Sequence, residues 1–77
     1  MKYKKSLSFK EKVLYVLSFL KKASAEDVSA EIIELDGLSA EEEVMEMTIE
    51  TKEQLNKLYE DGEVTRSGEC FIYSIKR

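Results

Sequence analysis

The sequence contains no histidine, no proline and no tryptophan, and it has only one cysteine and three glycines in 77 residues. A single cysteine excludes an internal disulfide framework, and the lack of histidine removes a principal ligand of zinc sites. No serine or cysteine has a base nearby in the sequence, and no glycine-rich phosphate-binding pattern occurs. We therefore expect a protein that is not an enzyme and that holds no cofactor or metal.

Long hydrophobic runs are also absent, since no segment approaches the roughly 20 apolar residues of a membrane span. The lysine-rich start and the run Val13–Leu20 resemble a secretion signal. However, the run has only eight residues, and Lys21 and Lys22 separate it from the small residues that a cleavage site would need. We expect a cytoplasmic protein in which Cys70 is a small buried hydrophobic residue.

The length predicts one domain over residues 1–77, in which residues 1–7 form a flexible basic arm or, alternatively, a short strand beside the C-terminal strand. A chain of this size buries only roughly 60% of its unfolded surface, so self-association is the remaining source of stability. The net charge of −4 is unevenly distributed. Residues 1–22 carry +6, residues 23–63 carry −12 and residues 64–77 carry +2.

Two capping signatures predict the starts of the first two helices. Ser8 and Glu11 fit a capping box, and Ser24 and Asp27 fit another. The second helix is expected to end at Asp36-Gly37. The first apolar stripe contains Val13, Val16, Leu17 and Leu20, widened by Leu14 and Phe19, and the second contains Val28, Ile32 and Leu35.

A third helix is predicted over residues 40–61, with a further cap signature at Ser39. Its apolar line, at 100° per residue, contains Val44, Thr48, Thr51, Leu55, Leu58 and Tyr59. The competing interpretation is a break near Thr48 with a restart at Thr51, but no glycine or proline interrupts the segment. Glu53 and Lys57 have the spacing of a stabilising helical ion pair.

The end of the chain predicts a β-hairpin. Val64 opens one strand, Ser67-Gly68 forms the turn, and the second strand spans residues 70–75. A two-residue loop at Ser67-Gly68 would pair Arg66 with Glu69 and Val64 with Phe71. The core side would then hold Val64, Phe71, Tyr73 and Ile75. Cys70 and Ile72 would point away, toward a partner or a covering segment.

The pattern Leu55-x-x-Leu58-x-x-x-Gly62-x-Val64 resembles the passage from the recognition helix to the wing of winged-helix proteins. The resemblance covers about residues 8–75 and implies an α+β, winged-helix-like fold of three helices followed by a C-terminal two-stranded hairpin. In DNA-binding members of this family, the helix before the wing enters the major groove. Here the exposed side of that helix carries one lysine, Lys57, and five acids, Glu46, Glu50, Glu53, Glu60 and Asp61. Such a side repels phosphate, and the stretch 36–47 is longer than the turn of the DNA-reading motif.

Two functional hypotheses follow. The favoured one is a non-enzymatic protein-interaction module that associates with itself as a homodimer or with another protein, through Cys70, Ile72, Glu50 and Glu53. The alternative is a DNA-binding, transcription-related regulator that uses the basic arm and the first helix. The residues expected to contact nucleic acid or a partner are Lys2, Lys4, Lys5, Lys10, Lys12 and Arg66. Together with Lys21 and Lys22, these lysines form either a basic surface for the acidic helix of a second copy or a scattered solubilising set.

Overall fold

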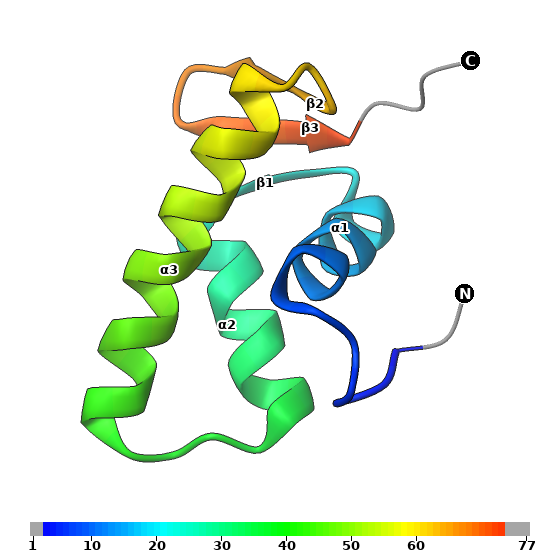
Figure 1. Cartoon of the computed structure of the whole chain (residues 1–77). Coiled ribbons are helices and arrows are strands. Elements are labelled where there is room, and N and C mark those ends of the chain that lie inside the picture. The colour runs from blue at the N-terminus through cyan, green and yellow to red at the C-terminus, as the bar shows by residue number, and fades with distance from the viewer. Residues whose placement is uncertain (1–2, 74–77) are drawn as a thin grey trace.

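The computed structural model describes residues 3–73, so the predictions for Lys2 and Ile75 lie outside the described residues. The elements are α1 (Phe9–Leu20), β1 (Lys22–Ser24), α2 (Ala25–Asp36), α3 (Glu41–Glu60), β2 (Val64–Ser67) and β3 (Cys70–Tyr73). Three helices precede the C-terminal hairpin, and β1 joins it in an antiparallel sheet of order β1-β3-β2 (Figure 1). This α+β architecture is consistent with a winged-helix-like topology, as predicted. The strand β1 was not predicted.

The local signals at the first two helix starts are confirmed. Ser8 Oγ accepts from the Glu11 backbone N–H at 3.2 Å, and the Glu11 carboxylate accepts from the Ser8 N–H at 3.1 Å. Ser24 and Asp27 form the same capping box at the start of α2. Gly37 ends α2 with a φ of 71°, a left-handed conformation that glycine adopts without steric cost.

The third helix is continuous from Glu41 to Glu60, which confirms the single-helix prediction. The predicted cap at Ser39 is wrong, because Ala40 is the N-cap residue and its side chain makes no capping hydrogen bond. Three glutamates in the first turn stabilise this helix end instead, since their charge opposes the positive end of the helix dipole.

The core lies where the three helices meet the inner face of the sheet. Its buried apolar residues are Val13, Val16, Leu17, Ala23, Val28, Ile32, Leu55, Leu58, Val64 and Phe71. Three residues assigned to apolar stripes are exposed instead: Phe19, Leu35 and Tyr59. Phe19 follows the buried Leu17 by two residues, about 200° around the helix, so it points away from the core. Leu35 and Tyr59 lie in the last turns of their helices, where fewer neighbours cover a side chain.

The hairpin register differs from the prediction. Val64 pairs with Tyr73 and Arg66 pairs with Phe71, so the two-residue loop is Gly68-Glu69. Gly68 has a φ of 62°, and a two-residue hairpin loop favours positive φ at its first position. The shift moves each pairing by two residues and therefore keeps the alternation of faces. Val64, Phe71 and Tyr73 share the core side, as expected.

Candidate interaction surfaces

The solvent side of α3 is strongly acidic because the helix buries its opposite side. Thr51, Leu55 and Leu58 are fully buried, and Glu50 and Glu53 are exposed on the other side. The ion pairs found among residues 3–73 are Lys10–Glu63 and Lys12–Asp36, so the expected Glu53–Lys57 pair is not formed. The carboxylates of Glu50 and Glu53, in the middle of α3, are therefore exposed to solvent and belong to neither ion pair of the described residues.

The residues predicted to mediate self-association lie in two places. Glu50 and Glu53 border a shallow hollow of about 270 Å³ on α3, together with Phe9 of α1. Cys70 and Ile72 are half-buried on β3, on the face of the sheet opposite Phe71 and the helices. The fold does not bring these two pairs of residues together into one surface.

The basic residues also divide into two groups. Lys10 forms an ion pair with Glu63 at 2.9 Å, and Lys12 forms one with Asp36 at 2.8 Å. Lys4 and Lys5 are exposed in the segment before α1, and Lys21 and Lys22 are exposed at its end. The lysines of the second group carry no ion pair within the described part of the chain, and the same holds for Lys52 and Lys57 of α3.

Arg66 contacts Gly68 and Phe71 and not the residue predicted from the sequence. Its Nε–H donates to the Gly68 carbonyl at 2.9 Å, and its guanidinium lies 5.5 Å from the centre of the Phe71 ring. The expected pairing with Glu69 is wrong, because Glu69 belongs to the loop. This cation–π contact holds the arginine on the inner face of the hairpin.

Asp36 is the centre of a polar cluster at the end of α2. It accepts hydrogen bonds from the Tyr3 hydroxyl and from Lys12, and the Tyr3 ring packs 5.4 Å from the Tyr15 ring. Burial alone would raise the pKa of Asp36, but the hydrogen bonds from Lys12 and Tyr3 and the lysine charges lower it overall. Burial, and then the contact with Asp36, raise the pKa of Tyr3. The cluster attaches Tyr3 to the helices.

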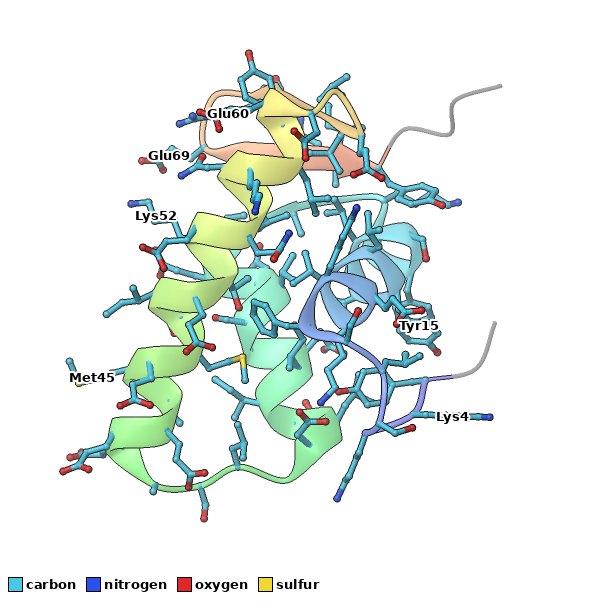
Figure 2. All side chains as sticks on the ribbon, viewed as in Figure 1. Lys4, Tyr15, Met45, Lys52, Glu60 and Glu69 are labelled. Atoms are coloured by element: carbon cyan, nitrogen blue, oxygen red, sulfur yellow. The ribbon has the colours of Figure 1, made fainter. Side chains whose placement is uncertain are left out.

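A groove of about 640 Å³ runs between α2, α3 and the hairpin. Its lining includes Ser29, Ile33, Thr48, Ile49, Lys52 and Phe71. Ser29 Oγ and Thr48 Oγ1 lie 3.3 Å apart and join the two helices. Figure 2 shows Met45 and Lys52 projecting from the same side of α3, with Glu69 of the hairpin on that side as well.

The exposed apolar residues of α3 beside this groove were not predicted from the sequence, although a signal was present. Met45 and Ile49 are 66% and 58% exposed, and they lie one helical turn apart. Their spacing continues through Lys52, Asn56 and Tyr59 in steps of four and three residues. A second apolar periodicity beside the core stripe would have indicated a surface available for contact.

Within residues 3–73, no group of three or more histidine, cysteine, aspartate or glutamate side chains is arranged to hold a metal ion. In the same part of the chain, no helix combines the length and apolar character that crossing a membrane requires. Comparisons with protein-family models, with curated proteins and with solved structures found no match.

Proposed function

We propose that this protein is a non-enzymatic interaction module of winged-helix type that associates with a second copy of itself. The observation that carries the proposal is the separation of charge between two exposed surfaces. The solvent side of α3 carries an excess of carboxylates over its two exposed lysines, Lys52 and Lys57, and further exposed lysines lie before α1 and at its end. Surfaces of opposite sign on one molecule attract each other between copies and orient the encounter.

The same charges argue for a protein partner over nucleic acid at α3. Phosphate contacts supply most of the non-specific affinity of DNA-binding proteins, and an acidic helix repels phosphate. Self-association also supports a chain of 77 residues, because binding that is specific for the folded state adds to its stability.

Sedimentation velocity over micromolar to millimolar concentrations tests the proposal. We expect association that grows with concentration and weakens as salt is added, because screening reduces the attraction between exposed charges. The double variant Glu50→Lys/Glu53→Lys should associate less. A matched control, Glu31→Lys/Glu34→Lys, changes the net charge equally on α2 and should associate like the wild type. A wild-type chain that stays monomeric throughout the range contradicts the proposal.

DNA binding is a second candidate, and the winged-helix-like topology together with the exposed Lys4 and Lys5 favours it. Titration of a labelled random duplex at low and moderate salt tests it. Lys4→Glu/Lys5→Glu is the informative variant, because both lysines are exposed, whereas Lys12 forms a largely buried ion pair with Asp36 whose reversal would also disturb the fold. Salt-sensitive binding that this variant loses supports the candidate, and no binding at low salt removes it.

A further inference from the structure

Three exposed apolar residues of α3 and two polar residues between them form a stripe with coiled-coil spacing. We define the α3 stripe as Met45, Ile49, Lys52, Asn56 and Tyr59. The alternating steps of four and three residues keep these side chains on one side of the helix, which is the geometry that pairs helices in a heptad repeat. Met45, Ile49 and Tyr59 are 66%, 58% and 47% exposed, so this side is uncovered within the described chain.

The stripe adjoins the groove described above. Ile49, Lys52 and Asn56 belong to both, the half-buried Ile33 adds apolar surface to the groove, and Arg66 also lines it. A volume of about 640 Å³ is well above that of one aromatic side chain and lies in the range of ligand-binding clefts. The combined surface therefore fits an apolar side chain projecting from a partner, with room for its flanking backbone.

The carboxylates at the edge of the stripe disfavour antiparallel pairing of α3 with another α3, although Lys57 lies among them. Glu46, Glu53 and Glu60 each follow a stripe residue by one position and lie along one edge. Two α3 helices packed in antiparallel orientation would place these carboxylates against each other, and like charges brought together at an interface cost free energy. The acidic edge therefore favours an occupant whose apolar group is flanked by positive charge.

The end of α1 has this combination. Phe19 is 73% exposed, the largest exposed fraction among the large apolar side chains of residues 3–73. Lys21 and Lys22 follow it by two and three positions, are exposed, and belong to neither of the ion pairs in the described chain. The chain thus carries an exposed aromatic side chain within three positions of two exposed lysines.

We propose that Phe19 of one copy inserts beside Ile49 of a second copy, with Lys21 and Lys22 facing Glu46 and Glu53. Both glutamates adjoin Ile49 on the helix surface, since one precedes it by three residues and the other follows it by four. The two carboxylates are about 10 Å apart along the helix axis, so each is available to a different lysine. This inference rests on the proposed self-association and assigns the two surfaces that make it.

Sedimentation of single variants tests the apolar contact. Phe19→Ser and Ile49→Ser should each weaken association about tenfold or more, as expected for a buried anchor and its pocket. Both residues are exposed in the monomer, and circular dichroism checks that the variants stay folded. Leu35→Ser, at another exposed apolar residue, is the matched control and should associate like the wild type.

A charge exchange tests the orientation. Lys21→Glu/Lys22→Glu and Glu46→Lys/Glu53→Lys should each lose self-association, because each variant presents like charges to itself. An equimolar mixture of the two should recover it, since the exchanged signs then match between the variants.

The outcomes separate this inference from the proposed function. Wild-type association that Phe19→Ser leaves unchanged overturns the inference and leaves self-association standing. Loss of association in Ile49→Ser alone does the same, because the stripe then receives another occupant. A mixture that fails to recover association also overturns the assignment. A wild-type chain that never associates contradicts the proposed function itself.

Discussion

At the scale of single residues, Asp36 has the most demanding environment. It is the last residue of α2, where the negative end of the helix dipole disfavours a carboxylate. Its side chain and that of Lys12 are only 11% and 13% exposed. The carboxylate is stable there because Lys12 and Tyr3 donate hydrogen bonds to its two oxygens. The cluster therefore links the N-terminal segment, α1 and α2.

We predict that Asp36→Asn lowers the free energy of unfolding by about 1.5–3 kcal/mol near neutral pH, the typical contribution of a hydrogen bond to a charged group. The fold lowers the pKa of Asp36 from its ordinary value of 3.8. Its stabilisation is therefore complete above that value and disappears as the pH falls through the lower folded pKa. Urea unfolding at a series of pH values measures both effects.

The difference between wild type and Asp36→Asn should consequently shrink in acid. Glu34→Gln removes an exposed carboxylate from the same helix and should change stability little at any pH. A difference between Asp36→Asn and wild type that persists in strong acid would show that the ionised carboxylate is not the source of the stabilisation.

At the scale of elements, the turn at Lys21 connects α1 to β1, the strand that pairs with β3. Lys21 has a φ of 70°, the one positive φ at a non-glycine position among the described residues. Its N–H donates to the Leu17 carbonyl, and its carbonyl accepts from the Tyr73 N–H at 2.9 Å. One residue therefore ends the helix and also bonds to the last residue of β3. With a ψ of −44°, Lys21 lies outside the common backbone regions of residues that carry a β-carbon, and such sparsely populated conformations cost of order 1–3 kcal/mol.

We predict that Lys21→Gly raises the free energy of unfolding by about 0.5–1 kcal/mol. Glycine removes the steric cost in the folded state, and the greater conformational freedom that it gives the unfolded chain cancels only part of this gain. Lys22→Gly is the matched control. Lys22 is in β1, where glycine weakens an extended strand, so this variant should be less stable than the wild type. Thermal unfolding measures the expected rise in stability of Lys21→Gly and the expected fall in stability of Lys22→Gly. A Lys21→Gly protein that melts below the wild type refutes the assignment of strain to Lys21.

At the scale of the whole molecule, all three helices and the hairpin contribute to one core. Leu17, Ile32 and Leu55 are fully buried contributions from α1, α2 and α3, and Phe71 of β3 covers them from the sheet. Small domains have unfolding free energies of only about 5–15 kcal/mol. The loss of one central side chain is therefore a large fraction of the total.

We predict that Leu55→Ala costs about 2–5 kcal/mol, through lost burial and the cavity that remains. Ile49→Ala removes a comparable side chain from the exposed side of the same helix and should change stability by no more than about 0.5 kcal/mol. Both are measured by urea unfolding at low protein concentration, where association does not contribute. Equal effects of the two substitutions would mean that the orientation of α3 is wrong.

The features that the sequence by itself determined are local ones. The caps at Ser8 and Ser24 and the stop at Gly37 each depend on residues within four positions of one another, so their hydrogen bonds are encoded in short motifs. The continuity of α3 follows from the absence of glycine and proline over the segment. The alternation of faces in the hairpin also survived a register error, because its period of two is a property of any strand.

Only the tertiary structure decided the remaining features, because they join residues that are distant in the chain. The strand β1 has three residues and no pattern of its own, and pairing with β3 is what makes it a strand. The Lys12–Asp36 pair spans 24 positions, and no motif announces it. The groove exists because α2, α3 and the hairpin meet, and the exposure of Ile49 and Phe19 depends on which sides of their helices the core covers. Long-range packing therefore determined which apolar and charged side chains remain available to a partner.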